Sequence, residues 1–204
     1  FPLELAVRAS VLTRSVLLAL LAGAALPRVA HATWSVIAID RSTGRMVVSS
    51  ATCVSQANLL RFPSKGLMDV QAIIAPGFGV AAAQAGVDRT RANQSLIHAE
   101  LQKGTHPSDI LAQLMADPAI QTRQFGILDL QGRFAGFSGS RNLAASLAVQ
   151  GQVPGTEIFY AIQGNILASN DVVQRAVRAF ESATGSIEDR VMAAMEAADA
   201  AGGD

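Results

Sequence analysis

Cysteine is nearly absent from this sequence. Cys53 stands alone among 204 residues, so no disulfide can form within the chain. Stability must therefore come from an apolar core rather than from covalent cross-links. We interpret Cys53 as a small buried hydrophobe, the commonest setting of a free cysteine; a reactive thiol or an intermolecular disulfide is the less favoured alternative.

Histidine is almost as scarce, with 3 residues in the whole chain. Beyond residue 32 only His98 and His106 remain, the first inside a predicted helix and the second directly before Pro107. No HExxH or CxxC pattern accompanies them, so we predict no metal site and no other cofactor. The nearest match to a serine-hydrolase elbow, Gly136–Ser140, lacks its final glycine and leads into a predicted loop. This argues against a Ser-His-Asp site.

Neither sign of charge is in excess. The chain has 16 Lys and Arg against 16 Asp and Glu, and aromatic residues make up only 5% of it. A protein that binds nucleic acid or an anionic membrane needs a basic surface, and single-stranded bases stack on aromatic side chains. We therefore expect neither partner. A small-molecule or peptide-like substrate remains as the expected partner, and nothing in the composition opposes a homo-oligomer.

The one long apolar run is too short to cross a membrane. It extends over twelve residues, from Ser15 to Leu26, whereas a spanning helix needs about 20. Arg8 and Arg14 precede the run, and the small-x-small triplet Ala30-His31-Ala32 follows it. This order is typical of a secretory signal peptide. We predict cleavage after Ala32, a secreted or periplasmic protein, and no membrane span once the signal is removed.

Past residue 33 the pattern alternates between paired strands and paired helices. β-Branched and apolar stretches around Gly- or Pro-containing turns predict strands, and apolar stretches with capping residues predict helices. The predicted strands cover residues 34–40, 46–52, 71–75, 79–85, 123–130, 133–137 and 157–163, and the predicted helices cover 88–103, 107–118, 170–184 and 186–201. Residues 139–156 are predicted to form one long loop.

This order of elements favours an α+β fold. Each pair of helices can cover one antiparallel sheet from outside, which predicts a four-layer α-β-β-α sandwich of two sheets. A two-layer α+β domain with a single sheet is the alternative. No repeat, linker or low-complexity segment divides the chain, so residues 33–204 are interpreted as a single domain that follows the signal of residues 1–32.

Thr33 would become the first residue after cleavage, and that position offers chemistry that needs no histidine. A threonine at the chain end carries its hydroxyl beside its own α-amino group. With a pKa of about 7.7–8.0, that amine is a usable general base at neutral pH. The position of Thr33 alone does not show that it is a nucleophile, because any small residue can follow a signal cleavage site and threonine also favours strands.

Gln84 and Asn165 are the leading candidates for polar partners of Thr33. Each stands at or just beyond a strand, in AAAQAG and IQGN, beside a glycine that lets a backbone or substrate approach closely. An amide can donate to an oxyanion without titrating. The alternative is that each amide satisfies backbone groups at a strand end. Ser35 is a weaker candidate, because strand alternation places it on the same face as Thr33 in any case.

Five segments carry a resemblance to a known family: TWSVIAIDRSTGRMVVSSATCV, PGFGVAAAQAGVD, RQFGILDLQGRFAGFSG, IQGNILASNDVV and AGGD. In order and spacing they resemble the bacterial and archaeal domain-of-unknown-function family 1028, over residues 33–204. That family is similar to the N-terminal-nucleophile hydrolases, whose fold is the α-β-β-α sandwich, and its members commonly begin at the equivalent of Thr33. Relatives continue past the segment matching 201–204 with at least one further strand, so the resemblance implies a domain truncated at its C-terminal end.

These observations predict an exported amidohydrolase. Thr33 is the expected nucleophile, the target is a linear amide or peptide-like bond, and Gln84 and Asn165 are the expected polar partners. The family has no established substrate, so the resemblance implies none. A non-catalytic cell-envelope or binding protein on the same fold is the alternative.

Overall fold

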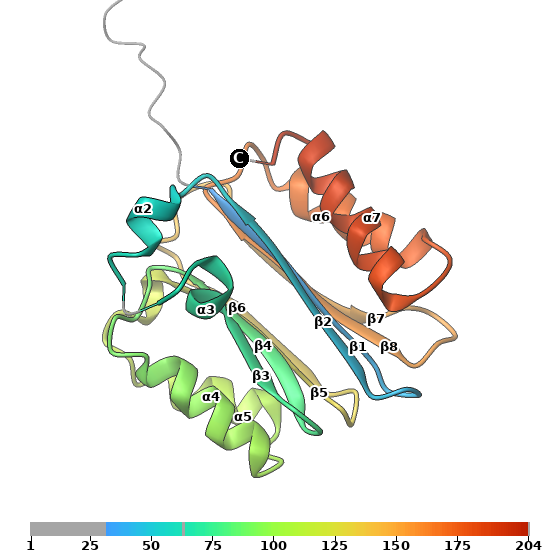
Figure 1. The fold of residues 1–204 in the computed structure, drawn as a ribbon, viewed down its shortest axis with the longest axis horizontal. Helices are drawn as coiled ribbons and strands as arrows, with labels where there is room; N and C mark the ends of the chain where they lie inside the picture. Colours follow the sequence, from blue (N-terminus) through green and yellow to red (C-terminus); the bar gives the residue numbers. More distant parts are fainter. Residues whose placement is uncertain (1–31, 63, 204) are drawn as a thin grey trace, which may run out of the picture. The chain divides into compact units, whose positions relative to one another are not determined.

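The computed structural model describes residues 32–62 and 64–203, which belong to one compact unit. Two four-stranded antiparallel sheets face each other, and paired helices cover their outer faces (Figure 1). The strands are β1 (Thr33–Asp40), β2 (Arg45–Thr52), β3 (Ala72–Ala75), β4 (Gly79–Ala85), β5 (Arg123–Asp129), β6 (Phe134–Ser138), β7 (Leu147–Gln152) and β8 (Ile158–Asn165). The longer helices are α4 (Ala92–Gln102), α5 (Pro107–Leu114), α6 (Asp171–Ser182) and α7 (Ile187–Ala200); α2 (Gln56–Leu59), α3 (Leu67–Gln71) and the 3-10 turn η1 (Ile120–Thr122) are short. The predicted sandwich is confirmed, and the single-sheet alternative is excluded.

The predicted signal peptide, residues 1–32, lies outside the described residues apart from Ala32. Cleavage and export therefore stay predictions. Within the described part of the chain, none of the helices combines the length and apolarity needed to span a bilayer.

Strand order differs from sequence order in the first sheet only. That sheet runs β2-β1-β8-β7, and the second runs β3-β4-β5-β6. Because β8 returns to pair with β1, Thr33 at the start of β1 lies between Thr52 on one side and Asn165 on the other. In the second sheet the register pairs Gln84 with Gln124. All of these residues therefore stand at the same end of the sandwich.

The predicted loop over residues 139–156 is wrong in its second half. Residues 147–152 form β7, which pairs along its length with β8 and completes the first sheet. Its sequence, LAVQGQ, has one β-branched residue, one glycine and two glutamines, so local propensity is weak. The strand exists because the edge of β8 offers it a full ladder of backbone hydrogen bonds.

Helix ends follow local capping with small shifts from prediction. Ser186 and Asp189 form the expected capping box at the start of α7. Asp88 does not directly precede α4, which begins at residue 92, but its carboxylate accepts the backbone N–H of Asn93 at 3.0 Å. The predicted helix to residue 118 ends at Leu114, because the chain turns before Pro118.

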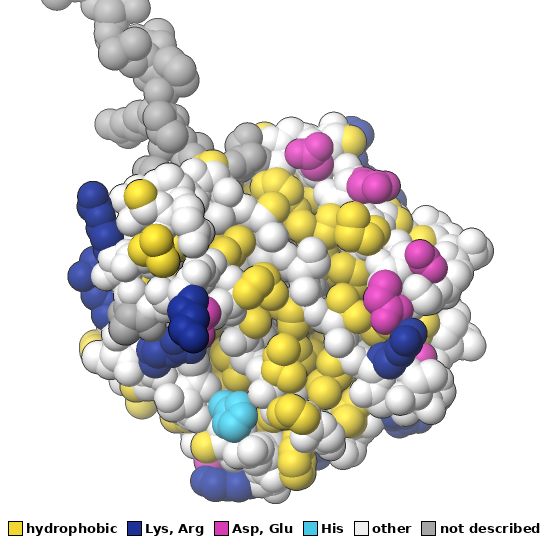
Figure 2. Space-filling model, in the orientation of Figure 1, with side chains coloured by type: hydrophobic (Ala, Val, Ile, Leu, Met, Phe, Trp, Pro, Cys, Tyr) yellow, Lys and Arg dark blue, Asp and Glu magenta, His cyan; other side chains and the backbone are white. Residues whose placement is uncertain are grey.

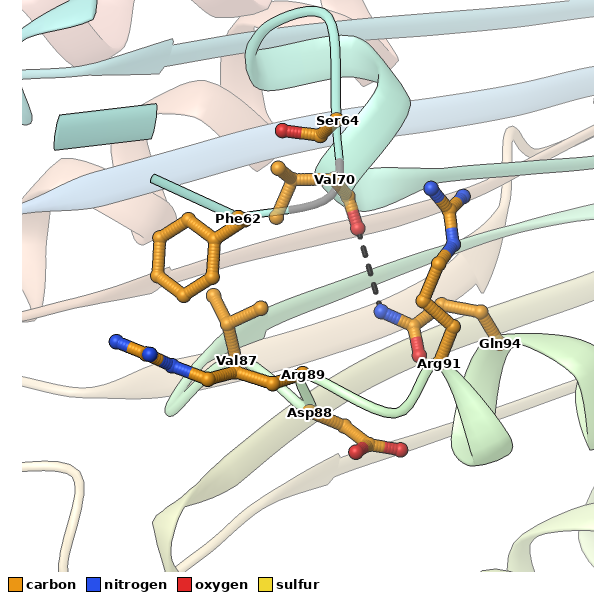
Figure 3. Close-up of a pocket in the computed structure, with 8 residues that line it drawn as sticks. All are labelled: Phe62, Ser64, Val70, Val87, Asp88, Arg89, Arg91 and Gln94. Atoms are coloured by element: carbon orange, nitrogen blue, oxygen red, sulfur yellow. Dashed lines mark hydrogen bonds between the residues drawn. The ribbon is translucent and has the colours of Figure 1, made fainter. Parts of the chain in front are cut away.

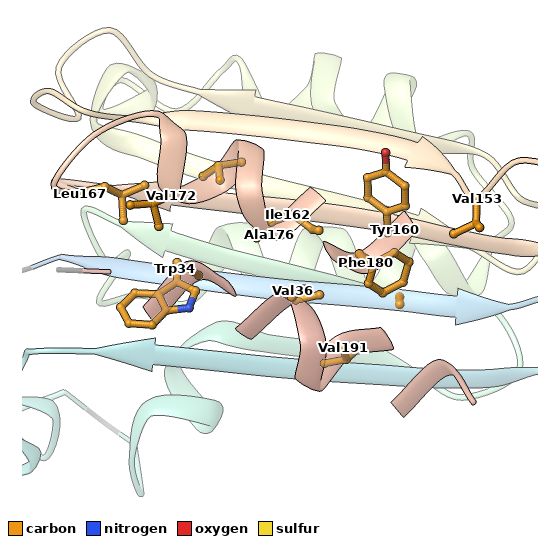
Figure 4. Packing of buried hydrophobic residues seen from close by; sticks show 14 of the residues in the cluster. Trp34, Val36, Val153, Tyr160, Ile162, Leu167, Val172, Ala176, Phe180 and Val191 are labelled. Carbon is orange, nitrogen blue, oxygen red and sulfur yellow. The ribbon is translucent and has the colours of Figure 1, made fainter. Parts of the chain in front are cut away.

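Successive side chains of β1 point to opposite faces of the sheet, and the two faces pack against different partners. Trp34, Val36 and Ala38 point toward α6 and α7, where they join a buried apolar cluster (Figure 4). Within that cluster Tyr160 and Phe180 pack with ring centroids 5.1 Å apart. Phe180 is fully buried, so its loss would cost about 3–5 kcal/mol of unfolding free energy.

The opposite face of β1 points into the space between the sheets and changes character along its length. Ile37 and Ile39 belong to an apolar cluster with Val80, Ala82, Leu128, Phe159 and Ala161. At the other end Thr33 and Ser35 are polar, and the facing strands supply Gln84, Gln124, Gln163 and Asn165, all buried. The inter-sheet layer is thus apolar at one end and polar at the end where β1 begins.

Hydrophobic side chains also gather on the face where β2 and β3 form the sheet edges (Figure 2). Ile74 of β3 is half exposed. The four longer helices cover the outer faces of the two sheets rather than these edges, so apolar strand residues such as Ile74 reach the surface there.

Gly126 of β5 lets the two sheets approach closely. A Cβ atom on it would lie 2.3 Å from Gln163 Oε1 and 3.0 Å from Ala161 Cβ. We expect Gly126→Ala to lower the free energy of unfolding by about 1–3 kcal/mol, because an added methyl group in a packed interior displaces its neighbours. Chemical denaturation measures this cost.

The matched control for Gly126→Ala is the same substitution in a Gln163→Ala background. Removing the Gln163 amide removes the nearest atom, so Gly126→Ala should cost at least about 0.5 kcal/mol less there. Equal costs in the two backgrounds would contradict the close approach.

Candidate functional site

A cluster of amides and hydroxyls fills the polar end of the inter-sheet layer. Its members are buried and come from strands of both sheets: Thr33, Ser35, Gln84, Gln124, Gln163 and Asn165. We call this set the amide cluster. Burying so many polar groups is costly unless each finds partners, so the hydrogen bonds decide whether it holds together.

Gln124 is the centre of the amide cluster. Its side-chain carbonyl accepts from Gln84 Nε2 at 2.7 Å and from Asn165 Nδ2 at 3.1 Å. Its own Nε2 donates to the backbone carbonyl of Gly164 at 2.8 Å and lies 3.1 Å from Ser138 Oγ. One fully buried side chain therefore ties β5 to β4 in its own sheet and to β8 in the other.

Thr33 meets both predicted amide partners, but through its backbone. Gln84 Nε2 lies 3.3 Å and Asn165 Nδ2 lies 3.4 Å from the Thr33 carbonyl oxygen. Their nitrogens are thus directed at internal carbonyl groups. The structure brings the three predicted residues together; the role of the two amides as oxyanion donors stays a prediction.

Ser35 also belongs to the amide cluster, two residues further along β1. Its hydroxyl donates to Gln84 Oε1 at 2.7 Å and accepts from Gln163 Nε2 at 3.1 Å. These two hydrogen bonds connect β1 to β4 in the other sheet and to β8 in its own sheet, so Ser35 helps to hold the strand that carries Thr33.

Thr52, like Gln124 and Gln163 of the amide cluster, was not among the candidates that the sequence indicated. Its hydroxyl lies 2.8 Å from the Thr33 hydroxyl and donates to the backbone carbonyl of Ala32 at 3.0 Å. The backbone N–H of Cys53 donates to that same carbonyl at 3.3 Å. A signal was present, since the turn at residues 42–44 makes a hairpin whose register places Thr52 opposite Thr33.

A cavity of about 270 Å³ opens beside Thr33 and Asn165. Its lining comes from the starts and ends of strands and the loops that join them: Thr33, Val54, Ala85, Gly86, Thr122, Arg141, Asn142, Leu143, Asn165 and Ile166. We call it the Thr33 cavity. Its volume is just below the range of about 300–1,000 Å³ that is usual for ligand sites.

Backbone strain gathers around the Thr33 cavity. Ala85, Leu143 and Ile166 have φ angles of 68°, 51° and 55°, in the left-handed region that non-glycine residues rarely adopt. All three line the cavity. Such strain persists only where the surrounding structure holds it, and it is concentrated at functional sites.

A second pocket, between α3 and the loop before α4, is too small to hold a substrate (Figure 3). Its volume is about 10 Å³, close to the space one water molecule needs. Gln94 lines it, donates to the Val70 carbonyl at 3.4 Å, and has a buried Oε1 with no partner among the described residues. This pocket suits hydration of a polar side chain rather than catalysis.

An ion pair stabilises the backbone next to the Thr33 cavity. Arg123, at the start of β5, donates through Nε to Asp117 at 2.8 Å and through a terminal nitrogen to the Gly86 carbonyl at 2.6 Å. Burial works to raise the pKa of Asp117, but hydrogen bonds from Arg123, Asn93 and the backbone of Ala119 outweigh it and hold the pKa at about 2. Asp117 is therefore ionised at neutral and mildly acid pH, and the pair keeps Gly86 in place.

Neither histidine is hydrogen-bonded to the amide cluster among the described residues, and each lies where the sequence predicted, in a helix and at a helix start. His98 lies on α4, and His106 caps α5 by accepting the backbone N–H of Ser108 at 3.2 Å. Among the described residues, no group of His, Cys, Asp and Glu could hold a metal ion. Cys53 is half buried and packs against the apolar cluster under α6 and α7, close to its predicted setting.

The fold and the site define an α-β-β-α sandwich protein with a buried amide cluster and a small cavity at one end of its sheets. Residues 33–204 match the family of unknown function DUF1028, and the chain belongs to that family. A crystal structure of a DUF1028 protein from Silicibacter pomeroyi is similar, with a TM-score of 0.68, 25% sequence identity, and coverage of 84% of this chain and 69% of that one. No curated protein matches the chain. The predicted family is confirmed; the likeness to N-terminal-nucleophile hydrolases stays a prediction.

Proposed function

We propose that this protein is an exported amidohydrolase with Thr33 as its nucleophile. The observation that carries the proposal is the position of the Thr33 hydroxyl: it lies 2.8 Å from the Thr52 hydroxyl, on a residue that lines the Thr33 cavity. The amides of Gln84 and Asn165 hold the same residue by its carbonyl oxygen. Such fixed positioning is what a nucleophile requires.

The reaction needs the peptide bond between Ala32 and Thr33 to be cleaved first. Cleavage frees the α-amine of Thr33, which takes the hydroxyl proton as Oγ attacks the carbonyl carbon of an amide. The C–N bond breaks, the amine passes the proton to the leaving nitrogen, and an ester on Oγ remains. Water then attacks that ester, again with the amine as base, and releases the acid.

Two donors are well placed for the oxyanion of this reaction. In the uncleaved chain the Thr52 hydroxyl and the Cys53 backbone N–H both donate to the carbonyl of Ala32, the group directly before Thr33. The acyl group of a substrate on Thr33 Oγ would occupy the same neighbourhood. In this proposal these two groups, in place of the amides of Gln84 and Asn165 that the sequence suggested, donate to the carbonyl oxygen of the substrate. Gln84 and Asn165 hold Thr33 in position.

Export and activation are one event in this proposal. A precursor keeps the nitrogen of Thr33 in a peptide bond, where it is no base. We expect the protein recovered from the periplasm or medium of its producing cells to begin at Thr33, as measured by Edman sequencing and intact mass. Brief periodate treatment should also convert its end to an aldehyde, because periodate cleaves a 1,2-amino alcohol and leaves internal threonine untouched.

A different first residue, or resistance to periodate, would rule out the mechanism. As a control, a variant with Ala32→Trp blocks the small-x-small signal and should accumulate uncleaved and periodate-resistant.

A non-catalytic envelope or binding protein is the second candidate. The observation that favours it is that the amide nitrogens of Gln84 and Asn165 both point at carbonyl groups of the chain itself. A free N-terminal Thr33 without any acylation by amide or ester probes would support this alternative.

A further inference from the structure

Among the described residues that line the Thr33 cavity, one has a cationic side chain and none has an acidic one. That side chain is the guanidinium of Arg141, which is an exposed residue. The ion pairs found within the described part of the chain all use other basic residues. An unneutralised guanidinium beside a cavity attracts an anionic ligand.

The loop that carries Arg141 is held firmly. The backbone N–H of Arg141 donates to the Gln121 carbonyl at 2.8 Å, and the side chain of Asn142 donates to the Arg123 carbonyl at 2.7 Å. The preceding Gly139 lies so close to Gln121 that a Cβ atom would meet its carbonyl oxygen at 2.3 Å. The backbone that carries Arg141 is therefore fixed, so less conformational entropy is lost when its side chain binds a ligand.

The remaining walls are apolar or hydroxyl-bearing. Val54, Leu143 and Ile166 provide aliphatic surface, and Leu143 is one of the most exposed large hydrophobic residues in the described chain, at 68%. Aliphatic walls, one guanidinium and a hydroxyl at Thr33 suit a small molecule with an apolar side chain and one negative group. The cavity is too small for a long peptide.

We propose that the Thr33 cavity binds the carboxylate of a small N-acylated amino acid or a C-terminal dipeptide, with Arg141 as the residue that recognises the carboxylate. The inference rests on the proposed function for the identity of the reacting amide, but recognition of the carboxylate is a property of the cavity itself. Arg141 binds the carboxylate as a bidentate partner, and the apolar side chain lies against Val54, Leu143 and Ile166.

The test uses two probes that differ only in their terminal group, a carboxylate or a neutral carboxamide: N-acetyl-leucine and N-acetyl-leucine amide. Their binding to the full protein as produced is compared by ligand-observed NMR and calorimetry. We expect the carboxylate to bind about tenfold or more tightly than the amide, because charge-assisted hydrogen bonds are the stronger ones. In Arg141→Gln the preference should vanish, and in Arg141→Lys part of it should remain. Arg45→Gln is the matched control, since Arg45 lies at the far end of β2 and pairs with Glu188, and it should keep the preference.

Each outcome separates the inference from the proposed function. Preferential carboxylate binding that depends on Arg141, without hydrolysis, supports the inference and counts against the hydrolase. Hydrolysis without any preference for the carboxylate, a preference that survives Arg141→Gln, or no binding of either probe at millimolar concentration would each overturn the inference. Circular dichroism of Arg141→Gln confirms that the exposed substitution leaves the fold intact.

Discussion

Replacing Thr33 with valine is expected to abolish covalent reaction at the site, by about three orders of magnitude or more. Valine has nearly the same shape as threonine, so the buried start of β1 keeps its packing while the hydroxyl is lost. A peptide epoxyketone is a suitable probe. The hydroxyl of an N-terminal threonine adds to its ketone and the free α-amine opens its epoxide, which closes a six-membered ring with no leaving group. Intact mass and peptide mapping would detect the adduct on Thr33 in the mature protein.

Two further variants act as controls for Thr33→Val. Thr33→Ser keeps both reacting groups and should retain labelling. The double variant His98→Ala, His106→Ala should label within a few fold of the unaltered protein, because no hydrogen bond of the described residues joins either ring to the amide cluster and His106 caps α5. Labelling of Thr33→Val at the normal rate would overturn the mechanism. A loss of several orders of magnitude in the histidine variant, with the fold intact, would revive a histidine-based site.

Replacing Gln124 with leucine is expected to lower the free energy of unfolding by about 2–4 kcal/mol. Leucine is similar in size but can neither accept nor donate. The nitrogens of Gln84 and Asn165, both buried, would lose their shorter hydrogen bonds, of 2.7 Å and 3.1 Å. The carbonyl of Gly164 would lose its 2.8 Å donor as well. Denaturant titration measures the cost, with the slope of the transition checked for a change in cooperativity.

Gln150→Leu is the matched control for Gln124→Leu. Gln150 lies in β7, and its side-chain nitrogen is buried with no hydrogen-bond partner among the described residues. Removing an unsatisfied group should be neutral or mildly stabilising, within about 1 kcal/mol. If both glutamine substitutions cost the same, the amide cluster would contribute no more than ordinary buried amides, and its central residue would be wrongly assigned.

The short-range features of this protein could be predicted because local physics decides them. The turn at residues 42–44 sets the β1–β2 hairpin, and the Ser186–Asp189 capping box starts α7. The strand β7 could not be predicted, because its residues favour no structure until the edge of β8 is beside them. The alternation of residues along β1 predicted that Thr33 and Ser35 share one face of the strand. It did not predict which side chains of the other strands lie opposite that face.

The sequence alone determined the class of fold, the family, and the meeting of Thr33 with Gln84 and Asn165 as a hypothesis about strand ends. Only the tertiary structure decided that Gln124 is the shared centre and that the Thr52 and Thr33 hydroxyls lie 2.8 Å apart. It also decided that Arg141 has the one charged side chain among the described residues lining the cavity. The physical reason is distance along the chain. Turns, caps and alternation act over a few residues, whereas Thr33 and Asn165 are 132 residues apart and meet only because β8 returns to pair with β1.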